Sequence, residues 1–301
     1  MDLLVGTRDG LHVLGAGERT VLQGQPVNAL GRSGDAFWGV VGHEGDEVWR
    51  DLLVSPVRPF AMGLRMNCVL PLDDRVFVGA AQATLLKADA DGGFRTVEGF
   101  RRVEGRSEWY TPWGGPPDVR TLSAEPDGAI YANVHVGGIP ISRDGGETWT
   151  PTIEVDADVH QVLAHPSQPG RVLAATAWGF ADSHDGGRTW EFVTDGLHAS
   201  YSRAVALADD TLLLTASTGP RGRAQAAVYR RPLDGDNPFE RCRDGLPEWF
   251  EGNVDSGCLD AQGEHAAFAA PDGSAWVSTD AGATWERAAS GLPEPRCLAL
   301  V

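Results

Sequence analysis

Four pairs of reactive side chains stand two residues apart in the chain, and their types suit the binding of an acid. The pairs are Asp118 with Arg120, Asp158 with His160, Tyr201 with Arg203, and Asn253 with Asp255. Residues i and i+2 of an extended strand project from the same face, so each pair would present both groups to one surface. Arginine forks hold carboxylates or phosphates through paired charge-assisted hydrogen bonds, and histidine or tyrosine can transfer protons. The pairs therefore predict a site for a small anionic ligand.

A repeated octapeptide indicates which elements must position these pairs. The pattern Ser-x-Asp-x-Gly-x-Thr-Trp occurs at Ser142–Trp149, Ser183–Trp190 and Ser278–Trp285. The first two copies begin 41 residues apart and the last two 95 apart, which predicts a degenerate copy between them near Arg231–Asp236. In such a turn Asp can cap backbone N–H groups, Gly can supply a positive φ, and Trp can pack between neighbouring units. The spacing predicts a chain built from similar units of roughly 43 residues.

Short apolar strands separated by Gly, Pro and Asp turns surround each copy of the octapeptide. Four such strands in about 43 residues have the size of a β-propeller blade. Seven first strands are recognisable: Val27–Leu30, Asn67–Leu72, Arg120–Ala124, His160–Ala164, Arg203–Leu207, Asp255–Asp260 and Arg296–Val301. No blade follows the last of them, and Asp2–Thr7 has no first strand before it, so the C-terminal strand is expected to complete the N-terminal blade. We predict an all-β fold, a seven-bladed β-propeller of four-stranded antiparallel blades, as one domain over residues 1–301 with an inserted loop at about residues 100–117.

The octapeptide resembles the BNR, or Asp-box, repeat of sialidases, sortilin-like receptors and photosystem-assembly propellers. All five fixed positions match in three copies. The resemblance implies a propeller over the whole chain, with each box forming the turn between the third and fourth strands of a blade. It also implies structural roles for Asp144, Asp185 and Asp280. The Arg-Ile-Pro signature of sialidases is absent, because Gly138-Ile139-Pro140 lacks the arginine.

The first strand of a propeller blade lines the central channel, and a polar residue recurs at the same early position of each predicted first strand. These residues are Asn28, Asn67, Arg120, His160, Arg203, Asp255 and Arg296. The ends of the second strands reach the same face and add His43, His135 and Trp178. Several arginines converging on one point suit a carboxylate or phosphate, and Asp118, Asp158 and Asp255 would offset their mutual repulsion.

These residues allow a specific hypothesis for a channel site. The anion would be held by Arg120, Arg203 and Arg296. His135 and His160, oriented by Asp158, would act as acid and base, with Tyr201 as a proton donor. Hydrolysis or β-elimination of an acidic sugar is the favoured chemistry, and seven-bladed polysaccharide lyases are similar in this outline.

Two other classes of function stay open. His135 and His160, together with an aspartate, are ligands that suit Zn, Mn or Fe, so a divalent metal could be bound, although no HxxxH or HxH spacing accompanies them. Trp109, Tyr110 and Trp113 in the inserted loop have the composition of a recognition surface. On that interpretation the propeller is a non-catalytic scaffold for a protein partner.

Composition limits the partners of the chain. The 25 Lys and Arg residues face 42 Asp and Glu residues, for a net charge of −17, which disfavours nucleic acids and anionic membranes. Four cysteines without a CxxC spacing predict reduced, mostly buried thiols. No apolar run approaches the roughly 18–20 residues of a membrane span, and no leader pattern is present at the start, so a cytoplasmic location is expected.

Overall fold

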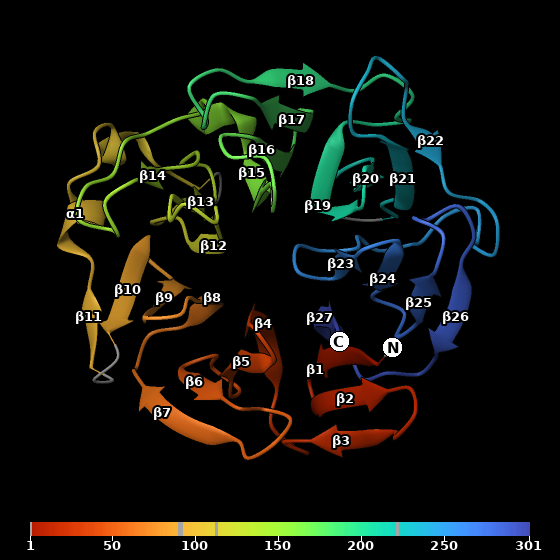
Figure 1. Ribbon diagram of the computed structural model, residues 1–301, viewed down its shortest axis with the longest axis horizontal. Coiled ribbons are helices and arrows are strands. Elements are labelled where there is room, and N and C mark those ends of the chain that lie inside the picture. The colour runs from red at the N-terminus through yellow and green to blue at the C-terminus, as the bar shows by residue number, and fades with distance from the viewer. Residues whose placement is uncertain (1, 90–92, 112–113, 221–222) are drawn as a thin grey trace. The chain divides into compact units, whose positions relative to one another are not determined.

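The structure is a computed structural model that describes residues 2–89, 93–111, 114–220 and 223–301. Nearly all regular structure in these residues is β-strand, arranged in seven antiparallel sheets (Figure 1). Six of the sheets have four strands and one has three. The fold is therefore a seven-bladed β-propeller, which confirms the fold class predicted from the repeat.

Two compact units make up the chain. The first consists of Met1–Val27, Ala175–Phe180 and Phe192–Val301. The second consists of Asn28–Ala174 and Ala181–Glu191. The single domain expected over residues 1–301 stays a prediction. Within the described ranges, no helix has the length and apolar character needed to cross a membrane.

The first unit contains three of the blades. Blade 1 consists of β27 (Pro295–Leu300), β1 (Leu3–Thr7), β2 (Gly10–Leu14) and β3 (Arg19–Val21). Blade 6 consists of β19 (Tyr201–Ala208), β20 (Thr211–Ser217), β21 (Ala227–Pro232) and β22 (Glu240–Arg241). Blade 7 consists of β23 (Leu259–Gln262), β24 (His265–Ala269), β25 (Ala275–Ser278) and β26 (Glu286–Ala289). Aromatic side chains such as Phe250, Phe268 and Trp285 pack together in the core between blades 6 and 7.

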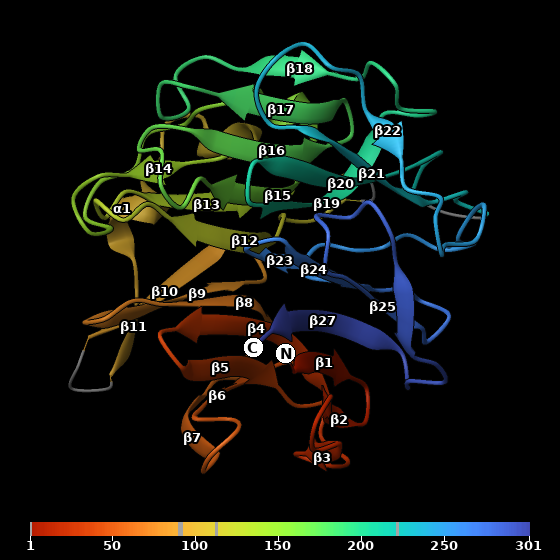
Figure 2. The same cartoon turned by 45° about the vertical axis from the view of Figure 1, so that its right-hand side comes forward.

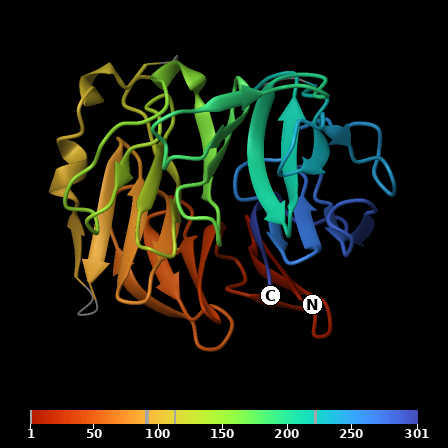
Figure 3. The ribbon, with the colours of Figure 1, turned by 45° about the horizontal axis from the view of Figure 1, so that its top comes forward.

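Blade 1 joins the two ends of the chain. Strand β27 pairs with β1 in antiparallel register, with Leu3 opposite Leu300 (Figure 2). A glycine is needed at position 6, because a Cβ on Gly6 would lie 2.3 Å from the Cys297 sulfur and 2.8 Å from the Val27 carbonyl oxygen. The C-terminal strand therefore completes the N-terminal blade, as predicted, and the chain ends are neighbours (Figure 3).

Four further blades follow one another along the chain. Blade 2 consists of β4 (Val27–Ser33), β5 (Ala36–Val41), β6 (Glu47–Arg50) and β7 (Val57–Ala61). Blade 3 consists of β8 (Met66–Pro71), β9 (Arg75–Ala80), β10 (Thr84–Asp89) and β11 (Phe94–Thr96). Blade 4 consists of β12 (Val119–Ala124), β13 (Ile130–Val134) and β14 (Ile141–Ser142). Blade 5 consists of β15 (Val159–Ala164), β16 (Val172–Thr176), β17 (Gly179–Ser183) and β18 (Glu191–Val193).

The segment predicted as an inserted loop connects β11 with β12 and contains helix α1 (Glu98–Arg101) and a 3-10 helix (Arg106–Glu108). Phe100 is fully buried, with its ring centroid 5.1 Å from that of Trp149 and 5.8 Å from that of Trp109. A Cβ on Gly99 would lie 1.9 Å from the carbonyl oxygen of Glu147. The segment is therefore packed tightly against the Asp box of blade 4.

Hydrogen bonds within each Asp box hold its turn. The Asp144 carboxylate accepts the backbone N–H of Thr148 at 2.9 Å and the hydroxyl of Ser142 at 2.9 Å. The bonds from Thr148 are the main reason that the pKa of Asp144 falls to about 2. Equivalent bonds lower the pKa values of Asp185 and Asp280 to about 2 as well. The carboxylate is the acceptor that several donors of the turn require, so these residues stabilise the fold.

Candidate functional site

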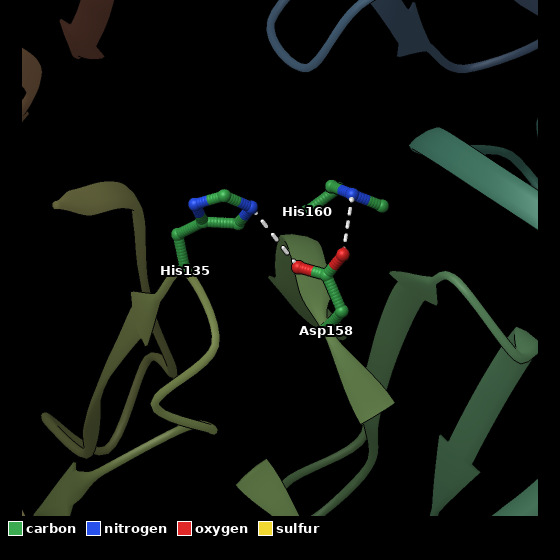
Figure 4. A group of neighbouring side chains, drawn as sticks. All are labelled: His135, Asp158 and His160. Atoms are coloured by element: carbon green, nitrogen blue, oxygen red, sulfur yellow. Dashed lines mark ion pairs between the residues drawn. The ribbon is translucent and has the colours of Figure 1, made fainter. Parts of the chain in front are cut away.

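Two histidines and an aspartate converge on one point in the second unit (Figure 4). His135 directly follows β13, Asp158 ends a 3-10 helix (Val155–Ala157), and His160 is the second residue of β15. The distance from Nε2 of His135 to Oδ1 of Asp158 is 3.1 Å, and that from Nε2 of His160 to Oδ2 of Asp158 is 3.6 Å. One ligand atom from each of the three residues lies within 4.8 Å of the other two. We call these three residues the His–Asp–His group.

The His–Asp–His group is largely shielded from solvent. His160 is completely buried, His135 is 5% exposed, and the Asp158 side chain is 24% exposed. Burial by itself raises the pKa of Asp158, but the hydrogen bonds and charge of the two histidines lower it more, so that the pKa lies well below its usual value. Asp158 is therefore a carboxylate at neutral pH, with one oxygen near each imidazole.

Positive φ angles occur at Asp158 and next to His135. Asp158 has φ +46°, and Val136, the residue after His135, has φ +49°. Positive φ is a genuine outlier for a β-branched residue such as valine. Residues held in such conformations cost about 1–3 kcal/mol each and are concentrated at functional sites. The backbone next to His135 is therefore strained at Val136, whereas Asp158 adopts a left-handed conformation that aspartate tolerates.

Tyr110, from the inserted segment, contacts both the turn after His135 and the turn before Asp158. Its backbone N–H donates to the carbonyl oxygen of Val136 at 3.3 Å, and its hydroxyl donates to Oδ1 of Asp156 at 3.1 Å. The pKa of Tyr110 is raised. The hydrogen bond to Asp156 is the largest cause, and the charge of Asp158 makes a smaller contribution. The phenol therefore bonds to the residue two positions before Asp158. The sequence predicted Tyr110 only as part of a recognition loop.

The neighbouring tryptophans of the inserted segment differ from Tyr110. Trp109 is 9% exposed and belongs to the hydrophobic core with Phe100, and the Arg106 guanidinium lies 4.8 Å from its ring centroid. Burial makes Trp109 a packing residue rather than a surface for a partner. Trp113 lies outside the residues that the structure describes.

The arginines expected to hold an anion have acidic neighbours of their own. Arg203 forms an ion pair with Asp255, and its Nη2 donates to the hydroxyl of Tyr201 at 3.2 Å. The distance from Nη2 of Arg296 to Oε1 of Glu294 is 3.6 Å. These carboxylates offset the charges of the arginines in the first unit.

Arg120 and Asp118 lie near the start of β12 in the second unit. Arg120 is half-buried and falls where the pairing of β12 with β13 shifts register between Val119 and Thr121. Asp118 forms an ion pair with Arg65, a residue that the sequence patterns did not single out, and its backbone carbonyl accepts the N–H of His135 at 3.0 Å. Asp118 thus supports the turn that carries His135.

The remaining residues predicted at the channel have varied surroundings. The Asn28 side chain donates to the carbonyl oxygen of Gly42 at 2.9 Å, and that of Asn67 donates to the carbonyl oxygen of Val119 at 3.1 Å. His43 is exposed on the turn after β5. Trp178 is 41% exposed, with its ring centroid 5.4 Å from that of Phe192. The two asparagines therefore connect neighbouring backbone segments.

The predicted site residues are divided between the two units. The second unit contains Asn28, His43, Asn67, Asp118, Arg120, His135, Asp158 and His160. The first unit contains Trp178, Tyr201, Arg203, Asp255 and Arg296. One anion site built from both sets stays a prediction, whereas the His–Asp–His group is complete within the second unit.

Comparison with known proteins agrees with the repeat analysis. A family profile described as the BNR/Asp-box repeat matches residues 141–151, which contain the first octapeptide. The chain carries a BNR/Asp-box repeat. The match confirms the predicted resemblance at the box of blade 4. No curated protein matches the chain in sequence.

Several solved structures share the propeller fold at low sequence identity. An ancestral GH74 enzyme has a TM-score of 0.62 at 15% identity over 84% of this chain, which spans only 37% of that enzyme. A catalytically inactive virginiamycin B lyase from Staphylococcus aureus, solved with quinupristin, has a TM-score of 0.64 at 12% identity, covering 91% of this chain and 96% of the lyase. YCF48 bound to a D1 peptide has a TM-score of 0.58 at 16% identity, covering 91% of this chain and 85% of that one. At these identities the likeness concerns the fold alone.

Proposed function

We propose that the protein binds a divalent transition metal through the His–Asp–His group and uses it to hold a small carboxylate ligand. The observation that carries the proposal is the convergence of two imidazoles on one carboxylate, at 3.1 and 3.6 Å, in a buried position. Imidazole and carboxylate together suit Zn, Mn, Fe and related ions.

The spacing of the donor atoms fits a metal site. A nitrogen or oxygen ligand lies about 2.0–2.2 Å from a bound zinc ion, so ligand atoms around one ion lie roughly 3–3.5 Å apart. The donor atoms of His135, Asp158 and His160 all lie within 4.8 Å of one another, so movements of about an ångström would bring them to that spacing. Three protein ligands leave coordination positions open for a ligand or water.

An acidic sugar is the first ligand to test. Its carboxylate would take an open coordination position, and bond cleavage by hydrolysis or elimination is the reaction to assay. The structural neighbours support this range of chemistry only as a class, since they include a GH74 enzyme and a lyase. In that reaction the chain itself would supply orientation, through His135, Asp158 and His160.

Isothermal titration calorimetry tests the metal site directly. Protein freed of metal with a chelator should bind about one equivalent of Co²⁺ or Zn²⁺, and Mg²⁺ much more weakly, because imidazole favours transition metals. His135→Ala and Asp158→Asn should lose that binding. His184→Ala is the matched control, because the His184 side chain is 64% exposed and lies outside the group. A wild-type protein that binds none of these ions would refute the proposal.

A thermal-shift screen tests the ligand. Glucuronate, galacturonate and sialic acid should raise the melting temperature only when the metal is present, since the metal is their anchor. The neutral sugars glucose and galactose serve as controls. Equal shifts without metal would show that the carboxylate is held elsewhere, for example by the arginines predicted at the channel.

A non-catalytic scaffold is the second candidate. It is favoured by the exposed aromatic pair Trp178 and Phe192 in the first unit, since exposed aromatic residues are typical of recognition surfaces. The fold also occurs in YCF48, whose structure holds a D1 peptide. If Trp178→Ala abolishes binding of an isolated partner peptide while Co²⁺ binding is unchanged, the scaffold function is supported independently of the metal site.

A further inference from the structure

We infer that Tyr110 is a positioning residue that holds the His135 turn and the Asp158 turn in register for metal binding. This inference rests on the proposed function, because it assigns Tyr110 a role toward the same site. On this inference the segment between β11 and β12 helps to form the metal site, a role that neither the repeat nor the propeller fold requires.

Two hydrogen bonds from one residue reach the two segments that carry the ligands. The backbone N–H of Tyr110 bonds to the carbonyl oxygen of Val136, which follows His135 in the chain. The Tyr110 hydroxyl bonds to Asp156, two residues before Asp158 and within the same 3-10 turn. A shift of either turn would move one ligand relative to the other, and Tyr110 resists both shifts.

The turn at Val136 needs such a restraint because its backbone is strained, and Asp158 lies in a tight left-handed turn beside it. Val136 and Asp158 have positive φ angles of +49° and +46°. Strained backbone persists only where the surrounding structure over-determines it. The contacts of Tyr110 with Val136 and Asp156 lie on these turns, next to the residues that would otherwise relax.

The inserted segment anchors Tyr110 firmly on its N-terminal side. Trp109 is buried in the core between blades 3 and 4, and Nη2 of Arg106 donates to the carbonyl oxygen of Ala83 at 2.8 Å. The close approach of Gly99 to the carbonyl oxygen of Glu147 holds helix α1 against the Asp box of blade 4. Tyr110 itself is 46% exposed, and its backbone N–H and hydroxyl bond to Val136 and Asp156.

Outer-shell partners of metal ligands have a measurable effect. Their loss typically lowers metal affinity about 10- to 100-fold. Tyr110→Phe keeps the ring and the backbone bond and removes only the hydroxyl, which bonds to Asp156 rather than to a ligand, so we expect a smaller loss in Co²⁺ affinity, about 2- to 10-fold, the value of one hydrogen bond. Asp156→Ala should have the same effect, and the double variant should lose no more than either single variant, because both remove one bond.

The experiment measures Co²⁺ affinity and the visible absorption spectrum of the Co²⁺ complex, which reports ligand geometry. Tyr110→Phe and Asp156→Ala should weaken binding and alter the spectrum, whereas Asp156→Asn, which keeps an oxygen acceptor, should restore most of both. Tyr131→Phe is the matched control, because Tyr131 donates a hydroxyl hydrogen bond to Glu125 elsewhere in the second unit. It should lower thermal stability without changing the Co²⁺ spectrum.

The outcomes separate the two proposals. A wild-type protein that takes up no Co²⁺ refutes the proposed function itself. If the wild-type protein binds Co²⁺ and Tyr110→Phe binds it with the same affinity and spectrum, the metal site stands and the role of Tyr110 is refuted. Additive losses in the double variant would also refute it, because the two groups would then act separately.

Discussion

Removal of one partner from the buried ion pair between Arg171 and Asp182 should destabilise the protein strongly. Nη2 of Arg171 lies 3.0 Å from Oδ2 of Asp182, and Nε lies 3.4 Å from Oδ1, so the pair is bidentate. The two side chains are only 5% and 8% exposed. Asp182→Ala leaves the arginine charge buried with its main partner gone, which typically costs about 3–5 kcal/mol.

The expected loss of unfolding free energy corresponds to a fall in melting temperature that depends on the length of the chain. Unfolding entropy is about 2.1 cal/mol/K per residue, so 301 residues give roughly 0.6 kcal/mol/K. The melting temperature of Asp182→Ala should then be about 5–8 °C lower than that of the wild type, as measured by differential scanning calorimetry or thermal circular dichroism. A reversible urea titration should give the same free energy and an unchanged slope.

A double variant shows whether the cost comes from the unpaired charge. Arg171→Met together with Asp182→Leu removes both charges, so it should be more stable than Asp182→Ala alone. The control is Arg101→Ala, because Arg101 and Glu98 form an exposed pair, with side chains 60% and 59% exposed, worth under about 1 kcal/mol. An Asp182→Ala variant that loses less than about 1 kcal/mol would contradict the reasoning.

The shifted pKa values give three further predictions. The four cysteines should not react with DTNB until the protein is unfolded, because burial raises the pKa of Cys68 and Cys297 to about 12 and that of Cys242 to about 11; fast labelling of the native protein would contradict this. The pKa of about 2 for Asp144 means that its box contributes stability above about pH 3.8, the unfolded value, and loses it as the pH falls toward 2; acid unfolding monitored by fluorescence should show a smaller loss over this interval in Asp144→Asn. Burial lowers the pKa of His198, so stability should decline as the pH falls below about 6.5, and His198→Gln should flatten that part of the stability profile measured by urea titration.

The sequence predicted the fold well because the Asp box reports a periodic structure. Five fixed positions at a regular interval define a unit size, and the missing first strand at the N-terminus predicted the pairing of β27 with β1. Both inferences depend on local patterns and counting. The strand bounds were less exact: Asp255 precedes β23, which begins at Leu259.

His135, Asp158 and His160 were among the candidates named from the sequence, but the geometry that brings them together was not predicted. Asp158 and His160 were paired because alternate residues of a strand share a face, yet Asp158 precedes β15 and has a left-handed backbone. They come together because the 3-10 turn redirects the carboxylate toward both imidazoles. Contacts such as that of Arg65 with Asp118, 53 residues apart, have no local signature, so no pattern in the sequence could have indicated them.

The pairing of β27 with β1 constrains how the protein is made. Strand β1 is synthesised before its partner, Pro295–Leu300, which follows almost 300 residues later in the chain. During that interval the nascent Leu3–Thr7 segment has an unsatisfied hydrogen-bonding edge, the kind of edge that promotes association between chains. Blade 1 can therefore be completed only after the blades between β3 and β27 have been synthesised, and β1 needs protection from association throughout that interval.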